Sequence, residues 1–281
     1  MLARSGCQVN ASTRPHSATA IIDMTTGRHI QVVAHRGNAA EFPENSLPAI
    51  RSALELGAPV IQIDVQLSSD CDAVVIHDAA LRRTAGIEGS VLDLQVVDAC
   101  AVEVAERARF GDRFAGVTLS RLSDVSSLLL EWPAAQLFVH LRHESLQRSG
   151  SEVFLSAVLT GLRSCIERCI IASADLPTVE LARRRGATGV AWMLPDYEHH
   201  SQLKCEAIRP DVLIIDRHRL SPGGPLWRGP WRWMVHEVST LPQALILASR
   251  GVELVRTMRV RAMLRELGIN PVERRARSRE G

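Results

Sequence analysis

Two histidines, an arginine and several carboxylates stand beside short apolar runs in the first third of this chain. His35 and Arg36 follow a β-branched run that predicts a strand, and Glu44 comes soon afterwards, where a helix-like segment begins. Asp64 lies near the end of the next strand-like run, and His77 ends a third. A fold alone does not require so many polar groups at strand ends. The pattern therefore predicts a site at one end of a sheet.

Four motifs connect these residues, in the order HRG (35–37), PENS (43–46), QID (62–64) and VVIHD (74–78). In this order and at these spacings they resemble the glycerophosphodiester phosphodiesterase family, whose pattern reads HRG, PENT, E-x-D and HD. The resemblance extends from about residue 32 to residue 264. It implies a TIM-type barrel that hydrolyses a glycerol-based phosphodiester.

The rest of the chain favours the same fold independently, because strand-like and helix-like segments alternate along it. Eight such alternations in a chain of this length are typical of a (β/α)8 barrel. Strands are expected at 31–35, 60–65, 137–141, 168–172, 188–193, 211–215, 232–236 and 253–257. Helices are expected at 46–57, 122–131, 151–165, 176–185, 197–206, 240–250 and 258–267, with a degenerate turn near 222–230.

Residues 79–121 interrupt this alternation with short, mixed elements, so the barrel is predicted to carry an insertion after its second strand. An insertion at the carboxyl end of a barrel strand lies on the catalytic face, where loops build the substrate pocket. The alternative is a surface elaboration without a functional role.

Composition fits a single barrel domain at 29–270, since the 281 residues are 46% hydrophobic and the net charge is only +2. We expect residues 1–28 to be disordered and 271–281 to form a basic, solvated tail, and neither indicates a nucleic-acid partner. We expect no secretory signal, because the first 28 residues contain no apolar run, and no stretch of the sequence is apolar for long enough to span a membrane. The six scattered cysteines are typical of reduced thiols, so a cytoplasmic location is expected, and the oligomeric state stays open.

Hydrolysis of a phosphodiester needs a base for the attacking oxygen and an acid for the leaving alkoxide, and histidine can serve as either. The resemblance implies that His35 and His77 form this catalytic couple. Arg36 and Arg142 are predicted to bind the phosphate, because a guanidinium group can hold two of its oxygens. Trp233 is a candidate for the substrate pocket, with core packing as the alternative.

The resemblance also implies a divalent metal, Mg²⁺ or Ca²⁺, held by four carboxylates of the family. Here Glu44 and Asp64 occupy two of these positions, whereas Gln62 and His140 replace the other two acids. The loss of two negative charges predicts weaker binding of hard ions. The His140 imidazole instead favours Mn²⁺ or Zn²⁺.

The leading interpretation is a hydrolase that cleaves a small glycerol-based phosphodiester to an alcohol and a phosphomonoester with divalent-metal help. One alternative is a divergent lysophospholipase D-like enzyme with a different head group. Another is a catalytically impaired member that binds phosphodiesters while its metal site decays.

Overall fold

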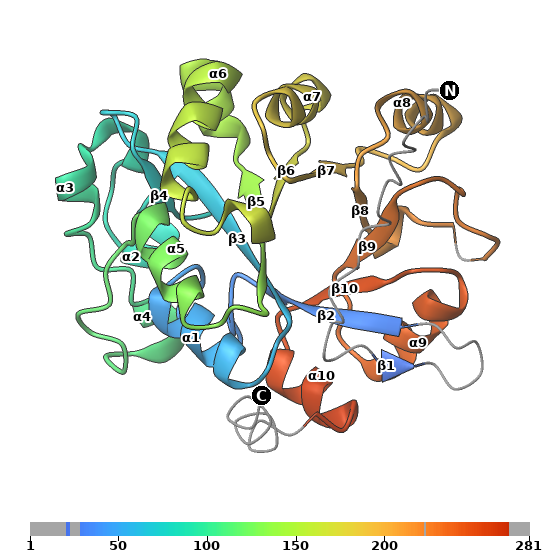
Figure 1. Ribbon diagram of the computed structural model, residues 1–281. Coiled ribbons are helices and arrows are strands. Elements are labelled where there is room, and N and C mark those ends of the chain that lie inside the picture. Colours follow the sequence, from blue (N-terminus) through green and yellow to red (C-terminus); the bar gives the residue numbers. More distant parts are fainter. Residues whose placement is uncertain (1–20, 23–28, 222, 270–281) are drawn as a thin grey trace, which may run out of the picture.

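Eight parallel strands close into a barrel in the computed structural model, which describes residues 21–22, 29–221 and 223–269 (Figure 1). The strands follow one another around the barrel in chain order, and the last pairs with the first. They are β2 (His29–His35), β3 (Val60–Leu67), β5 (Gln136–Leu141), β6 (Cys169–Ser173), β7 (Gly189–Met193), β8 (Val212–Asp216), β9 (Arg232–His236) and β10 (Leu254–Thr257). All eight predicted strands, and with them the predicted TIM-type barrel, are therefore confirmed.

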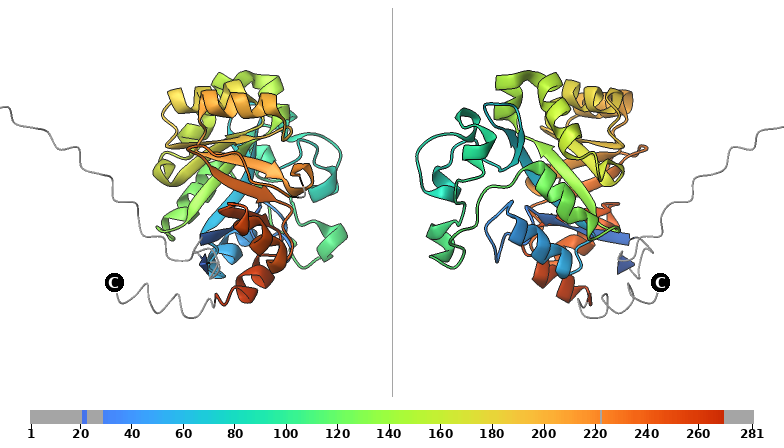
Figure 2. Two further views of the ribbon diagram at one scale, coloured as in Figure 1. Left: turned by 90° about the vertical axis from the view of Figure 1, so that its right-hand side faces the viewer. Right: turned by 60° about the vertical axis from the view of Figure 1, so that its left-hand side comes forward.

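Helices surround the barrel on its outer side (Figures 1 and 2). They are α1 (Leu47–Glu55), α5 (Leu122–Leu130), α6 (His143–Gly161), α7 (Leu176–Arg184), α8 (His199–Ile208), α9 (Leu241–Ser249) and α10 (Val260–Glu266). After β8 the described chain forms only the 3₁₀ turn η3 (Arg217–Arg219), so 223–230 contains no helix. Helix α6 begins earlier than predicted and is broken at Gly150, where φ is 77°.

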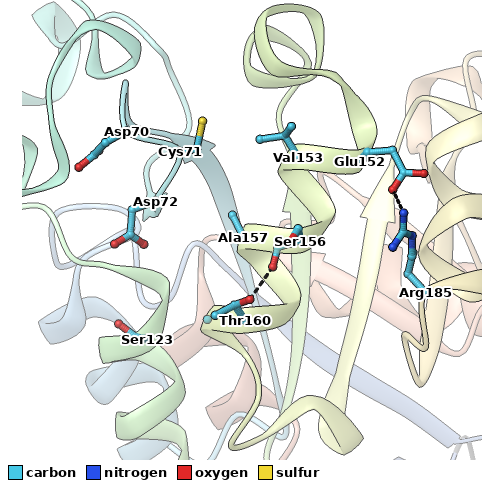
Figure 3. A pocket seen from close by; sticks show the side chains of 11 residues that line it. Asp70, Cys71, Asp72, Ser123, Glu152, Val153, Ser156, Ala157, Thr160 and Arg185 are labelled. Carbon is cyan, nitrogen blue, oxygen red and sulfur yellow. Dashed lines mark hydrogen bonds and ion pairs between the residues drawn. The ribbon is translucent and has the colours of Figure 1, made fainter.

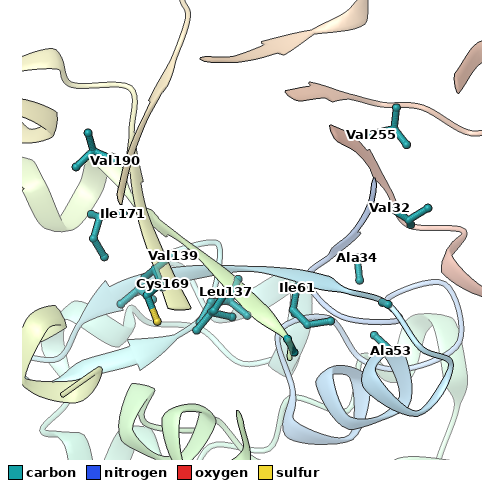
Figure 4. Close-up of a cluster of buried hydrophobic side chains, with 14 of the residues drawn as sticks. Val32, Ala34, Ala53, Ile61, Leu137, Val139, Cys169, Ile171, Val190 and Val255 are labelled. Atoms are coloured by element: carbon teal, nitrogen blue, oxygen red, sulfur yellow. The ribbon is translucent and has the colours of Figure 1, made fainter. Parts of the chain in front are cut away.

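Side chains alternate between the two faces of each barrel strand, as the period of an extended chain requires. One set fills the interior of the barrel; its members include Val33, Val60, Phe138, Met234 and Leu254. The other set faces outward and packs against the helices, as Figure 4 shows for members that include Val32, Ala34, Ile61, Leu137 and Val255. This alternation decides which strand-end residues can reach the mouth of the barrel.

The insertion follows β3 by way of the strand β4 (Ala73–Val75), which pairs antiparallel with β3. Its short elements are α2 (Arg82–Ala85), η1 (Val91–Asp93), α3 (Val96–Ala99) and α4 (Arg107–Phe110). It has a hydrophobic cluster of its own, which includes Ile76, Leu81, Val91 and Leu119. The insertion lies at one side of the barrel, next to α1 and the β3–β4 hairpin (Figures 1 and 2).

Most of the predicted disordered segment 1–28 and the whole predicted tail 271–281 lie outside the described residues. Within the first segment, β1 (Ile21–Ile22) pairs antiparallel with the start of β2. No helix in the described ranges is long and apolar enough to cross a membrane. The five cysteines of the described chain form no disulfide, although the Sγ atoms of Cys165 and Cys169 are 3.6 Å apart.

Candidate active site

The barrel register brings the predicted site residues into neighbouring positions. His35 at the end of β2 lies beside Gln62 of β3, and Asp64 of β3 lies beside His140 of β5. Side chains two or four residues apart on a strand point to the same face. Each of the four residues is that far from an interior residue of its own strand, as His35 is from Val33, so all four face inward. They are also buried. Four predicted residues from three separate strands thus meet at the mouth of the barrel.

Asp64 is the centre of this group, and both of its carboxylate oxygens are occupied. Oδ1 accepts hydrogen bonds from Gln62 Nε2 at 3.2 Å and His140 Nδ1 at 3.0 Å. Oδ2 accepts a hydrogen bond from Asn45 Nδ2 at 3.2 Å. Oδ2 also forms an ion pair with Arg36 Nε at 2.9 Å, although the angle at this N–H is unsuitable for a hydrogen bond. Burial would raise the pKa of Asp64, but the His140 hydrogen bond and the Arg36 charge hold it well below its ordinary value. Asp64 is therefore ionised and fully surrounded by donors.

The loop between His35 and α1 is held in place by local geometry that the sequence indicates. Gly37 has a φ of 78°, and Ser46 caps α1 by accepting a hydrogen bond from Ala49 N at 3.3 Å. Asn45 makes two hydrogen bonds with Asp64: its Nδ2 donates to Asp64 Oδ2, and its Oδ1 accepts from Asp64 N. It therefore positions the carboxylate.

Glu44 is bound by two arginines. Its Oε1 accepts from Arg36 Nη1 at 2.9 Å and from Arg83 Nη2 at 2.6 Å. Arg83 comes from α2 in the insertion, and its Nε also contacts Asp78 Oδ2 at 2.5 Å. The insertion thus contributes a charged side chain to the predicted site.

The two histidines have different surroundings. Burial, together with the charges of Arg256 and Arg36, holds the pKa of His35 well below its ordinary value, so His35 is neutral at neutral pH. The His77 ring is more exposed, and its Nδ1 donates to Asp78 Oδ1 at 2.5 Å, which leaves Nε2 as the available nitrogen. Both rings interact electrostatically with Asp64.

Arg142 follows β5 and is oriented by the backbone of His77, whose carbonyl accepts from Arg142 Nε at 3.1 Å. Its terminal nitrogens form no hydrogen bond within the described ranges. The orientation brings a cation next to one of the two predicted catalytic histidines.

Trp233 does not lie in this group, which corrects the expectation that it lines the substrate pocket. It is one residue from the interior Met234 and therefore faces outward, where it is buried against Tyr197 and Trp227. Its Nε1 donates to the carbonyl of Trp227 at 3.1 Å. The packing alternative is the right one for this residue.

His236 and Arg256 reach the mouth of the barrel from β9 and β10, and neither was among the predicted site residues. Each stands two positions beyond an interior residue, Met234 and Leu254 respectively. Burial and the charge of Arg256 lower the pKa of His236 to about 3. A charged residue within the apolar strand 254–257 is the signal that could have drawn attention to Arg256 in the sequence.

The insertion is fastened to the loop before α1 by a buried carboxylate. Glu106 Oε1 accepts from Glu44 N at 2.6 Å, and Oε2 accepts from Arg109 Nη1 at 2.6 Å. Little space remains at this junction, where Thr84 and Val104 line a cavity of about 10 Å³ with Glu44. The insertion is therefore part of the support for the site.

We expect Glu106→Ala to lower the free energy of unfolding by about 2 kcal/mol, because the buried N–H of Glu44 would lose its acceptor. Urea denaturation measures the change. Glu88→Ala is the matched control, since Glu88 is an insertion carboxylate with a side chain 82% exposed. Equal losses in both variants would contradict a role for Glu106 in fastening the insertion.

A separate hollow of about 790 Å³ lies on the outer side of the barrel, between the β3–β4 hairpin and α6 (Figure 3). Asp70, Asp72 and Ser123 line one side, and the ion pair of Glu152 with Arg185 lies at the other. None of the strand-end residues lines this hollow. The chemistry of the protein is therefore expected at the barrel mouth.

A closed (β/α)8 barrel with several histidines and arginines at its mouth belongs to the class of barrels suited to anionic esters. Residues 35–120 match the Glycerophosphoryl diester phosphodiesterase family. A probable glycerophosphodiester phosphodiesterase 1 of Mycobacterium tuberculosis is 32% identical over 215 residues, which cover 64% of this chain and 78% of that protein. The chain belongs to the glycerophosphodiester phosphodiesterase family.

Other comparisons agree with this assignment but cover less or are more distant. A glycerophosphodiester phosphodiesterase of Caldanaerobacter subterraneus is 40% identical over 98 residues, or 35% of this chain. The chain spans 40% of the length of that protein and 49% of two Bacillus relatives. A solved phosphodiesterase of Oleispira antarctica, in complex with the product sn-glycerol-3-phosphate, has the same fold, with a TM-score of 0.71 and 18% identity over 85% of this chain and 96% of that one.

The family generally depends on a divalent metal, but the side chains here do not fit a hard divalent ion. Both oxygens of Asp64 are taken by donors, and Glu44 Oε1 is held by two guanidinium groups. Gln62 Oε1 is buried without a hydrogen-bond partner, yet it is only a neutral ligand, as is His140 Nε2. In the part of the chain that the structure describes, no three His, Cys, Asp or Glu side chains form a group that could hold a metal.

Proposed function

We propose that the protein hydrolyses a small glycerol-based phosphodiester to an alcohol and a phosphomonoester. The observation that carries the proposal is that His35 and His77 both interact electrostatically with Asp64. Arg36 contacts this carboxylate, and Arg142 contacts the backbone of His77. Membership of the family supports the reaction type, and the product bound to the Oleispira enzyme supports a glycerol phosphate moiety in the substrate.

In this mechanism the two histidines share the proton transfers. An oxygen of water, or of a substrate hydroxyl, attacks phosphorus and forms a new P–O bond while the P–O bond to the leaving alkoxide breaks. The neutral ring of His35 accepts the proton of the attacking oxygen. His77 gives a proton to the alkoxide, and Asp78 stabilises the charge of its protonated ring. When water attacks, the phosphomonoester forms directly, and proton exchange with solvent restores both rings. When a substrate hydroxyl attacks, the product is a cyclic phosphate, which water opens to the phosphomonoester with the roles of the two rings exchanged.

The remaining residues orient these groups. Arg142 lies next to His77 and offers its terminal nitrogens to the phosphate oxygens. Arg36 is held by Glu44 and Asp64, so its position is fixed before substrate arrives. Fixed donors around the phosphate stabilise the extra negative charge of the transition state without a reorganisation cost.

A second candidate function is binding of phosphodiesters without turnover. It is favoured by the ion pairs and hydrogen bonds that already engage the two acidic residues. Because arginines and amides occupy Glu44 and Asp64, a member that binds phosphodiesters without turnover would have the same arrangement. Only an activity measurement separates this binding role from hydrolysis.

We expect the purified protein to convert glycerophosphocholine to sn-glycerol-3-phosphate and choline. ³¹P nuclear magnetic resonance measures this conversion. Reaction in H₂¹⁸O should place one ¹⁸O in the phosphomonoester if water attacks phosphorus. Lysophosphatidylcholine is tested in parallel, because faster turnover of it would favour the lysophospholipase D-like alternative. If neither substrate is converted, with chelator or with added Mg²⁺, Ca²⁺, Mn²⁺ or Zn²⁺, the proposed hydrolysis is wrong and the binding role is favoured.

A further inference from the structure

Arg256 is a buried cation without a counter-ion. It faces the interior from β10, is 6% exposed, and its Nε has no hydrogen-bond partner. No carboxylate of the described chain lies within 4.0 Å of its guanidinium group. Burial lowers the pKa of Arg256 to about 10, so the side chain still carries its charge at neutral pH. A desolvated charge of this kind is costly unless an anion approaches it.

The imidazoles around Arg256 are neutral. Burial and the nearby arginine hold the pKa values of His35 and His236 below the ordinary value, and burial lowers that of His140. Arg256 also interacts electrostatically with Asp64, although that carboxylate is already engaged by Arg36. The positive charge of Arg256 is thus not neutralised by the groups nearest to it.

The balance of charges at the barrel mouth favours an anion over a cation. Three carboxylates, those of Glu44, Asp64 and Asp78, face four guanidinium groups, which leaves one net positive charge. The guanidinium groups are those of Arg36, Arg83, Arg142 and Arg256. A divalent cation would be repelled by this set. A phosphodiester carries one negative charge and would balance it.

Two further acids lie on the same rim but alter this balance little. Asp216 and Glu237 have side chains 29% and 51% exposed, so water screens their charges more than those of the buried groups. Both lie 3.9 Å from His236 Nδ1.

We propose that Arg256 binds the phosphate of the substrate and supplies the positive charge that a divalent metal supplies elsewhere in the family, so that phosphate binding and turnover require no metal ion. The turnover part of the proposal rests on the proposed hydrolysis, whereas the binding part does not. A guanidinium group suits this role because it can hold two phosphate oxygens and stays charged when buried. Its unpaired N–H groups lie in the low-dielectric interior, where they stabilise a developing negative charge most strongly.

The first test measures binding of inorganic phosphate to chelator-treated protein by calorimetry. Arg256→Met keeps most of the side-chain volume and should weaken phosphate binding at least tenfold, while Arg256→Lys should weaken it less, because the charge remains. Arg259→Ala is the control, since Arg259 is an exposed arginine just beyond β10. Unchanged phosphate affinity in a folded Arg256→Met protein, or affinity that appears only after Mg²⁺ is added, would overturn the proposal.

The second test measures turnover of glycerophosphocholine with chelator and with added Mg²⁺. We expect the natural protein to turn over at the same rate within about twofold in both conditions. Guanidinium ion at non-denaturing concentration should partly restore turnover to Arg256→Ala, because it can occupy the vacated volume. Turnover that needs Mg²⁺ and is unaffected by the loss of Arg256 would overturn this inference while leaving the proposed hydrolysis intact.

A converse variant tests the charge balance directly. Gln62→Glu with His140→Glu returns two carboxylates, but Arg256 should still oppose a cation, so the double variant should gain little Mg²⁺ affinity. Adding Arg256→Met should raise Mg²⁺ affinity at least tenfold over the double variant, as measured by calorimetry with Mg²⁺ alone. Equal Mg²⁺ affinities in the double and triple variants would contradict the role of Arg256.

If phosphate binding depends on Arg256 but no substrate is hydrolysed, the binding inference stands and the proposed hydrolysis fails.

Discussion

Replacing His35 or His77 by alanine is expected to lower turnover by ~10² or more, because positioned proton transfer contributes about that much. Both rings interact electrostatically with Asp64 but differ in surroundings, since His35 is buried and His77 is paired with Asp78. Turnover of glycerophosphocholine is measured for each variant, and thermal unfolding checks that the fold is kept.

His199→Ala is the matched control for the two histidine variants. His199 is an exposed histidine at the start of α8 and is not among the residues of the candidate site. Asp78→Asn should cost less than His77→Ala, because the ring remains but loses the carboxylate that orients it. Turnover near that of the natural protein in either histidine variant would remove that residue from the mechanism.

Gly37→Ala is expected to destabilise the protein by about 3 kcal/mol or more, because two costs add at this position. The φ of 78° is unfavourable for a residue with a Cβ. In addition, an ideal Cβ would lie 2.5 Å from the carbonyl carbon of Ala49, in the backbone of α1, which cannot move aside as a flexible side chain could. Urea and thermal denaturation measure the loss.

Gly86→Ala separates the two costs. Gly86 has a φ of 74°, close to that of Gly37, but no heavy atom lies within 4 Å of the Cβ position. We therefore expect a loss of about 1 kcal/mol from backbone strain alone. Similar losses in the two variants would show that the contact with α1 contributes nothing. Because Gly37 follows His35 and Arg36 directly, the Gly37 variant should also lose activity.

The sequence by itself determined the strands of the barrel and the motif residues at their ends. Local patterns carry this information, since strands such as 60–65 are short apolar runs and turns carry residues such as Gly37 and Ser46, whose roles are local. The parallel order then brought His35, Gln62, Asp64 and His140 together without further information. In a barrel, consecutive strands end at one face, so residues at strand ends must meet.

Only the tertiary structure decided how these residues are bonded. Arg83 and Glu106 reach Glu44 from the insertion, 39 and 62 positions along the chain, and no local pattern predicts such contacts. Arg256 was hidden in an apolar strand and Trp233 appeared suited to a pocket, until the closed register showed that Arg256 faces inward and Trp233 outward. The side-chain period along a strand is two, so a shift of one residue exchanges the faces, and only closure of the barrel fixes which face is inside.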